Sequence, residues 1–473
     1  MPCILPPRGS RTESRFVQED VPVTDEGRNV VPLRTAVRTW FLISWQTFGG
    51  PAGQIAVMHR ELVEERRWIG ERRFLHAMSY CMLLPGPEAQ QLAVYSGWLL
   101  NGWVGGLVAG VLFVLPGFIT ILALSWVYVA HGDSTLVTGV LLGLAAAVIP
   151  IVVQAVLRLG RRAVLNRVLL VLALGAFLAL AVLGVPFPVV VLASGVAGWL
   201  LGRWRPGLTR LPEPAEPADG RPPLIPDDAL HTTPRSARRS LGYLAVGLVL
   251  WAAPVAAAYA LAGGQRTVFT EQGLFFGGMA LVTFGGAYAV LSYVAQAAVE
   301  HYGWLTAQEM VRGLALAETT PGPLIMVVQF VAFLGAFRDP GSLDPWAAAV
   351  LASVLVVWVT FVPCFLFVFL GAPYVERLRG NETLAAALTG VSAAVVGVIA
   401  NLALYFTVHT LFAEAERIGW EHLGLLVPVW SSFQWQPAAL GALGAVLVFG
   451  LRWPVLRTLG VCGLAGLGLA LVT

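Results

Sequence analysis

Lysine is absent from this sequence of 473 residues, and charged residues of any kind make up only 12% of it. Apart from histidine, every basic side chain is an arginine, and the formal net charge of only +3 gives no indication of a nucleic-acid partner. Hydrophobic residues, by contrast, make up 57% of the chain, and the mean hydropathy is +0.75. A soluble globular protein of this length cannot bury so much apolar surface, so we expect most of the chain to lie in membrane lipid.

Cysteine is also scarce, and its spacing excludes the sites that depend on it. The four cysteines, Cys3, Cys81, Cys364 and Cys462, are far apart and form no pair with the spacing of a zinc, redox or disulfide motif. The sequence also lacks the cluster of His, Asp and Glu, or the nucleophile motif, that a membrane-embedded enzyme needs. We therefore expect no metal, no cofactor and no enzymatic activity.

Long apolar runs account for most of the chain. Four of them reach the roughly 20 residues that a helix needs to cross the hydrocarbon layer, namely Val104–Ala130, Leu136–Leu157, Val164–Leu183 and Ala347–Leu370. They lack the period-2 alternation of a membrane β-barrel. Residues 1–33 are polar, so we expect no cleavable secretory signal, and the first spanning segment must direct insertion. The predicted fold class is an all-α polytopic membrane protein.

The positions of the arginines predict the orientation of the chain, because short basic loops stay on the cytoplasmic side. Arginines cluster at 158–167 and again in the Pro-rich stretch 203–239, which has no apolar period and is predicted to be a flexible cytoplasmic linker. His131–Thr135 has no arginine, and Glu414–His422 is net acidic. We expect these two segments of a multi-pass membrane protein to face outward.

A tripeptide, Pro-Gly-Pro, occurs twice in apolar surroundings, and each copy lies the same distance after a Phe-Gly-Gly. Phe48-Gly49-Gly50 aligns with Phe284-Gly285-Gly286 at a numbering offset of 236 (284 minus 48), and Pro85-Gly86-Pro87 aligns with Pro321-Gly322-Pro323 at the same offset. Trp68 and Trp304 keep this offset too. The chain is therefore predicted to be a duplicated membrane module.

The spans predict about six crossings in the first half, one extra helix at Leu241–Leu261 and about six more crossings. The extra helix delivers the second repeat upside down, which predicts an inverted-topology repeat as in many secondary transporters. Ala36–Met58 and Phe74–Trp98 would also suit broken or re-entrant helices, which would lower the count. The predicted domains are a cytoplasmic N-terminal tail (1–35), a first repeat (36–202), a cytoplasmic linker (203–240), an extra transmembrane helix (241–262) and a second repeat (263–473).

The Pro-Gly-Pro motifs predict helices that break inside the membrane. Proline removes a backbone donor and glycine lets the chain turn, and such a break is tolerated only beside protein or a water-filled cavity. The helix that restarts after a break presents unpaired N–H groups and its positive dipole end, which favour an anion. The candidate substrate-binding residues are Gly49, Gly50, Pro85, Gly86, Pro87, Gln90, Gln91, Gly285, Gly286, Thr319, Thr320, Pro321, Gly322 and Pro323.

Two glutamates lie beside the breaks, Glu88 after the first Pro-Gly-Pro and Glu318 before the second. A carboxylate in hydrocarbon is costly unless it is paired or protonated, so each is a candidate either for coupling a proton or for capping a half-helix.

Farther along, Gln154 aligns with Asn401 at a numbering offset of 247 (401 minus 154). These amides either line the site or bond helices together, and the second role is favoured.

Taken together, these motifs resemble those of the chromate ion transporter family, in its long bidomain type. The resemblance covers both halves from about Thr39 onward and includes Leu84–Gln91, Val282–Tyr288 and Ala317–Pro323. It implies efflux of chromate from the bacterial cytoplasm across the inner membrane, energised by the proton motive force, with chromate resistance as the result. Sulfate or another tetrahedral oxyanion is the alternative substrate. The expected partners are the oxyanion and membrane lipid, and a homo-oligomer is left open.

Overall fold

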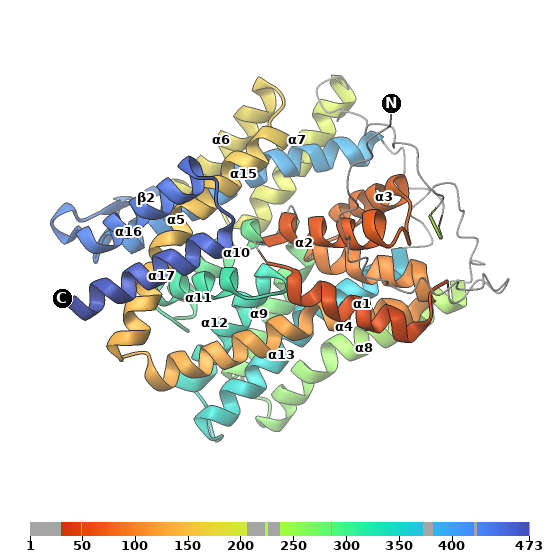
Figure 1. The fold of residues 1–473 in the computed structure, drawn as a ribbon, viewed down its shortest axis with the longest axis horizontal. Helices are drawn as coiled ribbons and strands as arrows, with labels where there is room; N and C mark the ends of the chain where they lie inside the picture. Colours follow the sequence, from red (N-terminus) through yellow and green to blue (C-terminus); the bar gives the residue numbers. More distant parts are fainter. Residues whose placement is uncertain are drawn as a thin grey trace, which may run out of the picture.

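The computed structural model describes residues 30–48, 50–205, 223–225, 237–284, 286–371, 382–420 and 423–472 (Figure 1). Most of these residues are helical, and the described strands form one antiparallel hairpin, β1 (Ala415–Trp420) with β2 (Leu423–Pro428). The chain is thus an all-α polytopic membrane protein, as its apolar runs predict. Residues 1–29 of the predicted tail, most of the linker, Gly49 and Gly285 lie outside the described residues.

Seven α-helices belong to the first repeat. They are α1 (Leu33–Gln46), α2 (Gly50–His59), α3 (Glu71–Leu83), α4 (Glu88–His131), α5 (Thr135–Ala163), α6 (Arg167–Ala181) and α7 (Phe187–Trp204). A π-helical turn, η1 (Arg60–Glu65), continues α2. The long helix α4 is interrupted by non-helical backbone at Asn101 and Gly102, so it consists of two helices that meet at a kink.

The second repeat follows the helix α8 (Ala237–Leu261) and has the same order of elements. Its helices are α9 (Val268–Val282), α10 (Ala287–Gln296), η3 (Ala297–His301), α11 (Ala307–Thr319), η4 (Leu324–Met326), α12 (Val327–Arg338), α13 (Pro345–Gly371), α15 (Glu382–Leu411), η6 (Trp430–Ser432), α16 (Trp435–Ala445), η7 (Val446–Gly450) and α17 (Val455–Val472). Both η1 and η3 are π-helical, and each directly continues the helix that follows a Phe-Gly-Gly motif. The duplication in the sequence is therefore repeated in local structure.

The helices that are long enough to span a membrane are fewer than the crossings predicted for the two halves, and the count of about six in each half stays a prediction. Among the described residues, seven helices are long and apolar enough to span a membrane, namely α4, α5, α7, α13, α15, α17 and the part of α8 from Ser240 to Leu261. Helices α6, α9, α12 and α16 are apolar but shorter. Ala36–Met58 and Phe74–Trp98 are each divided by a break into two short helices, because glycine and proline interrupt them. Hydropathy alone does not distinguish such a pair from one spanning helix.

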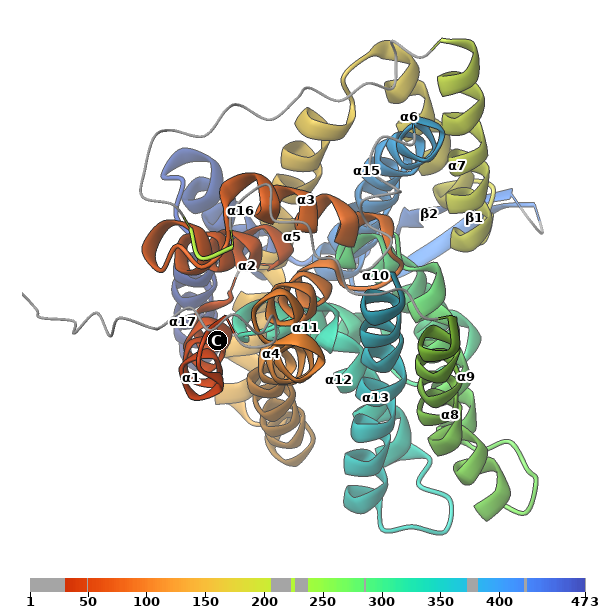
Figure 2. The same cartoon turned by 90° about the vertical axis from the view of Figure 1, so that its right-hand side faces the viewer.

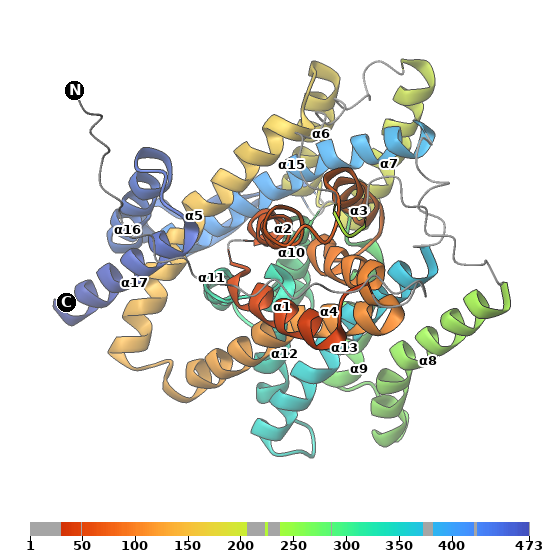
Figure 3. The same cartoon turned by 45° about the vertical axis from the view of Figure 1, so that its right-hand side comes forward.

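The last two helices of each repeat pack against a helix of the other repeat. Helices α6 and α7 lie along α15, and α16 and α17 lie along α5, while α5 and α15 pack against each other (Figures 1 and 3). Small residues permit these close approaches, since a Cβ atom on Gly143 would overlap the carbonyl of Cys462, and one on Gly390 would overlap the carbonyl of Ser194. The two repeats are thus interlocked.

Helix α8 lies at the edge of the molecule (Figures 2 and 3), and no part of its apolar span is buried by the rest of the protein. It touches α9 and α13 along one side. This is the position that lipid would cover, and it agrees with the role of an added helix between two repeats. In the linker, the backbone N–H of Ile225 donates to the carbonyl of Trp68, which ties the linker to the turn before α3.

Candidate functional site

Four helix breaks meet inside the protein. The chain leaves helical conformation between α1 and α2, between α3 and α4, between α9 and α10, and between α11 and η4. A glycine with positive φ lies at each break, with φ values of 75° at Gly50, 121° at Gly86, 100° at Gly286 and 95° at Gly322. Glycine is required there because a side chain would strain this backbone. The breaks predicted at Phe-Gly-Gly and Pro-Gly-Pro are therefore present.

Reciprocal hydrogen bonds join the breaks of the two repeats. The backbone N–H of Gly86 donates to the carbonyl of Thr283 over 2.8 Å, and the N–H of Gly322 donates to the carbonyl of Thr47 over 3.0 Å. Gly322 is the equivalent of Gly86, and Thr283 is the equivalent of Thr47, at the numbering offset that relates the repeats. Such a pair of bonds is the pattern of a two-fold relation, in which a residue of one repeat contacts a second residue in the other repeat and the equivalents of these two residues make the same contact. The breaks thus lie together at the contact between the repeats.

Four helices restart at this point, two more than the Pro-Gly-Pro motifs predict. Besides α4 and the η4–α12 segment, helices α2 and α10 begin at the Phe-Gly-Gly motifs. The first N–H groups of a helix have no partner within it, and its N-terminal end carries partial positive charge. The N–H groups of Gly86 and Gly322 are already bonded, so the donors left for a ligand belong to the first turns of the restarted helices.

Two glutamines at the start of α4 bring amide groups to the breaks. Gln90 and Gln91 are both completely buried. The Nε2 of Gln91 donates to the carbonyl of Pro85 over 2.7 Å, whereas neither amide atom of Gln90 has a partner among the described residues. Burying an amide without a hydrogen bond is costly, so Gln90 is available for a ligand or water.

A third glutamine, Gln54 on α2, was not predicted. Its Nε2 donates to the carbonyl of Gly322 over 2.6 Å, which ties the first repeat to the second Pro-Gly-Pro. Tyr288 on α10 was not predicted as a site residue either. Both residues lie in the first turns of the helix that follows a Phe-Gly-Gly motif, where a polar side chain faces the break. Their position relative to the motif could have identified them from the sequence.

The two glutamates have different surroundings. Glu318 is only 2% exposed, and its Oε1 accepts a hydrogen bond of 2.5 Å from the hydroxyl of Tyr288 while Oε2 has no partner among the described residues. It lies in the last turn of α11, where the helix dipole disfavours a negative charge. Glu88 is the first residue of α4, half-buried, with Oε1 about 3.0 Å from the point that a Cβ atom on Gly286 would occupy. Glu88 thus lies at a favourable helix end, and Glu318 at an unfavourable one.

The hydroxyls of Thr319 and Thr320 donate to carbonyls within α11, those of Leu316 and Ala317. The hydroxyl hydrogens of both threonines are thus already engaged in hydrogen bonds.

Of the aligned amides, Asn401 donates to the hydroxyl of Ser292 over 3.3 Å, which bonds α15 to α10, and Gln154 accepts from Arg158 one turn away. The interpretation of Asn401 as a bond between helices agrees with this contact.

The packing around the breaks differs between the two repeats. Helices α10 and α11 of the second repeat pack against α15 and α5. Within the described part of the chain, α2 and α3 have no comparable interface with α5 or α15. Accordingly, Ala56 on α2 is exposed, whereas Ser292 at the equivalent position of α10 is buried. The breaks are therefore covered on the side of the second repeat and more open on the side of the first.

We expect replacement of Gly86 by alanine to lower the free energy of unfolding by about 1–3 kcal/mol, because alanine is strained at its φ of 121°. The added Cβ would also lie 2.8 Å from Sγ of Cys364 and 2.9 Å from Nε2 of Gln91. Thermal unfolding in detergent measures the change. Gly278→Ala on α9, where a Cβ meets nothing within 4 Å, is the matched control and should unfold like the unaltered protein. Equal stability of all three proteins would contradict this account of Gly86.

Comparisons with known proteins agree with the motifs. A family model described as chromate transporter matches residues 34–199 and 270–467. A chromate transport protein of Pseudomonas aeruginosa is 34% identical over 382 residues, 80% of each chain. Another chromate transport protein, of Cupriavidus metallidurans, is 31% identical over 78% of this chain and 80% of the relative, and a probable chromate transport protein of Synechococcus elongatus is 29% identical over 75% and 79%. No solved structure matches.

Proposed function

The chain belongs to the chromate transporter family, and we propose that it exports chromate from the cytoplasm across the bacterial inner membrane and so confers chromate resistance. It acts as a secondary transporter rather than an enzyme. The observation that carries this proposal is the meeting of four restarted helices at one buried place. Beside them lies the fully buried amide of Gln90, which has no hydrogen-bond partner in the part of the chain that the structure describes. Helix N-termini of this kind favour a tetrahedral oxyanion.

The proposed anion site lies between the first turns of the restarted helices. The main donors are their N–H groups, and Gln90 and Gln91 add amide hydrogens to the oxyanion oxygens. The Phe-Gly-Gly and Pro-Gly-Pro glycines let the backbone approach the ligand and join the repeats. Sulfate has the same charge and shape as chromate, so transport of sulfate or another tetrahedral oxyanion remains the alternative function.

The transport cycle proposed is alternating access between inverted repeats. The reciprocal bonds between breaks, the exchange of helix partners and the odd helix α8 between the repeats all support a two-fold relation with the second repeat inverted. The unequal packing of α2 and α10 supports a state open on the side of the first repeat. Arg60 of η1 and the arginines in the last turns of α5, at positions 158, 161 and 162, favour the cytoplasm for that side.

The membrane potential favours export of a dianion. An inside-negative potential contributes about 2.3 kcal/mol per charge per 100 mV, hence about 4.6 kcal/mol for two charges. This term drives efflux by itself, and entry of protons adds to it where the two are coupled. We propose that the proton motive force energises the cycle through one or both of these terms.

Chromate flux in proteoliposomes tests the proposal. We expect the purified protein to move chromate when a potential is imposed and, separately, when a pH gradient is imposed. Excess sulfate in the same assay separates the two substrates, since a protein selective for chromate keeps most of its flux. If no chromate moves under either gradient while sulfate does, the alternative function replaces the proposed one. Absence of both fluxes contradicts oxyanion transport.

A further inference from the structure

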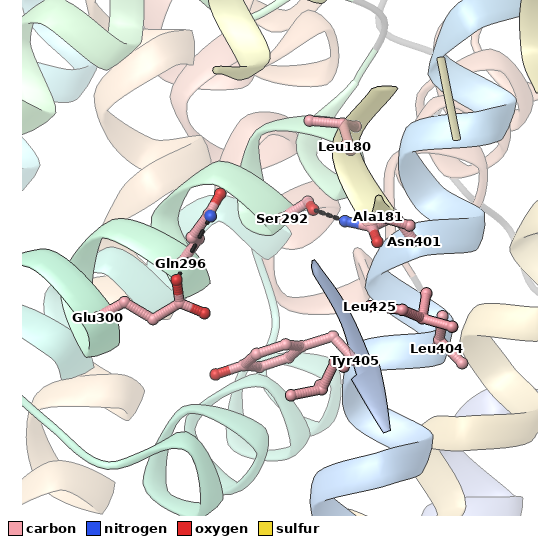
Figure 4. Close-up of a pocket in the computed structure, with 10 residues that line it drawn as sticks. Leu180, Ala181, Ser292, Gln296, Glu300, Asn401, Leu404, Tyr405 and Leu425 are labelled. Carbon is pink, nitrogen blue, oxygen red and sulfur yellow. Dashed lines mark hydrogen bonds between the residues drawn. The ribbon is translucent and has the colours of Figure 1, made fainter. Parts of the chain in front are cut away.

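A polar cavity lies between α10–η3 and α15, away from the four breaks (Figure 4). Its volume is about 40 Å³, enough for a few water molecules. The polar groups that line it are Ser292, Gln296, Glu300, Asn401 and Tyr405, and Leu180, Ala181, Leu404, Leu425 and Leu426 complete the wall. Because Leu425 and Leu426 belong to β2, the cavity lies beside the hairpin whose segment 414–422 is predicted to face outward.

The polar groups of α10 and η3 form one continuous stripe. Tyr288, Ser292, Gln296 and Glu300 recur at every fourth position and therefore lie on one face. Exposure rises along the stripe, from buried Ser292 through half-buried Gln296 to exposed Glu300. Figure 4 shows Gln296 bonded to Glu300, and Ser292 bonded to Asn401 across the cavity. The stripe leads from the protein surface towards the breaks.

The inner end of the stripe is bonded to Glu318. The hydroxyl of Tyr288 donates to one carboxyl oxygen of Glu318, and the other oxygen is buried without a partner among the described residues. A negative charge without a cationic partner is costly at this buried position, and this cost favours the protonated form of Glu318. No other described residue of the stripe contacts a buried carboxyl group in this way.

The first repeat lacks this stripe. At the positions equivalent to Tyr288 and Ser292 the sequence has Ala52 and Ala56, neither of which can carry a proton. The outer positions are Arg60 and Glu64. A polar stripe of this kind therefore exists in only one of the two repeats. A packing role common to both repeats would place polar residues at the equivalent positions of each, so such a role does not explain the stripe.

The cavity is suited to protons rather than to the oxyanion. None of the residues that line it is a lysine or arginine, and none belongs to the first turn of a restarted helix, so the cavity offers a dianion neither a cation nor a helix N-terminus. Tyr405 lies against His409, with ring centroids 4.2 Å apart, so a second titratable group adjoins the wall. Around the inner end, the charged residues are Glu88 on α4, beside Gly286, and Arg158 on α5, which acts electrostatically on Tyr288.

We propose that this cavity is the entry route for a coupling proton and that Glu318 is its acceptor, a proposal that rests on the oxyanion export described above. A proton from outside passes Glu300 and the cavity water to the Tyr288 hydroxyl. That hydroxyl gives its own proton to the Glu318 carboxylate and takes the incoming one, so Tyr288 is unchanged and Glu318 becomes neutral. The charge on Glu318 is thereby linked to anion binding at the nearby breaks.

Chromate binding to the purified protein as a function of pH is the first test. If the protonation of Glu318 is linked to anion binding one for one, the Kd changes about tenfold per pH unit over the range in which Glu318 titrates. The variant Glu318→Gln keeps a neutral group at this position, so its Kd follows only the protonation of chromate itself. The difference between the two profiles isolates Glu318. Identical profiles for the two proteins overturn its role as acceptor.

The route is tested by the variant Gln296→Leu, which fills the stripe with an apolar side chain. We expect chromate exchange without a gradient to persist, while flux driven by a pH gradient falls about tenfold or more, as for loss of a proton-transfer group. Leu464→Ala, at an exposed position of α17 that does not line the cavity, is the control and should keep both fluxes. Gradient-driven flux of Gln296→Leu at the level of the unaltered protein overturns the route.

The failures of the two proposals are distinguishable. If the unaltered protein neither binds nor exchanges chromate, the proposed function fails. If it does both, and Glu318→Gln or Gln296→Leu loses exchange as well as gradient-driven flux while remaining folded, the altered residue belongs to the anion path, and the proton route is overturned.

Discussion

Replacing Gln90 by leucine is expected to abolish most chromate transport while leaving the fold as stable as before, or more so. The amide of Gln90 is completely buried and has no hydrogen-bond partner among the described residues, so leucine relieves the cost of an unsatisfied polar group. In the proposed site the same amide donates to the oxyanion. A hydrogen bond to a charged group contributes about 1.5–3 kcal/mol, so we expect chromate affinity to fall about tenfold to a hundredfold.

Gln272 on α9 is the matched control for Gln90. It is also completely buried, and its Oε1 has no partner among the described residues, but its Nε2 donates to the carbonyl of Ala332 over 3.3 Å, at a distance from the breaks along α9. Gln272→Leu should therefore lower the unfolding temperature and leave chromate affinity unchanged, the reverse of the pattern for Gln90→Leu. Isothermal titration and thermal unfolding on the two variants measure both quantities. If Gln90→Leu binds chromate like the unaltered protein, Gln90 has no part in the site.

A single methyl group at Gly143 is expected to prevent assembly of the two repeats. A Cβ atom there would overlap the backbone carbonyl of Cys462 on α17, and a backbone group cannot move aside as a flexible side chain does. Gly390 occupies the equivalent place on α15, against the carbonyl of Ser194 on α7. We expect Gly143→Ala and Gly390→Ala each to cost about 3 kcal/mol or more, the upper end of overpacking effects.

Two other helical glycines provide the control. A Cβ atom on Gly175 of α6 or Gly460 of α17 meets nothing within 4 Å. Alanine at either place should be neutral or slightly stabilising, because alanine is favoured over glycine in a helix by up to about 1 kcal/mol. Size-exclusion profiles and unfolding temperatures in detergent compare the four variants. If the Gly143→Ala variant folds normally and keeps the unfolding temperature of the unaltered protein, α5 and α17 do not pack as closely as the structure shows.

Most of what the sequence predicts about the site follows from the duplicated motifs. The constant offset between the two Phe-Gly-Gly and Pro-Gly-Pro pairs predicts equivalent breaks, and the positive φ of Gly50, Gly86, Gly286 and Gly322 confirms them. Glycine and proline act locally, so their effect can be foreseen from the sequence alone. The all-helical membrane fold follows in the same way from composition and the length of the apolar runs.

What the sequence could not predict depends on contacts between distant segments. The exchange of helix partners, α7 with α15 and α17 with α5, requires the three-dimensional arrangement of both repeats. The same holds for the bond from Gln54 to Gly322, which joins the two halves of the chain. The number of crossings stays a prediction, because an apolar segment with a break has the same hydropathy as one that spans. The predicted roles of the site residues themselves remain predictions.

The central claim is that the four breaks hold the oxyanion between them. A structure determined with bound chromate, in which anomalous scattering locates the chromium atom, tests this most directly. We predict a single strong peak among the first turns of α2, α4, α10 and η4–α12, within hydrogen-bonding reach of the Gln90 amide. A chromium peak elsewhere in the protein, with the region of the breaks empty, would contradict the claim.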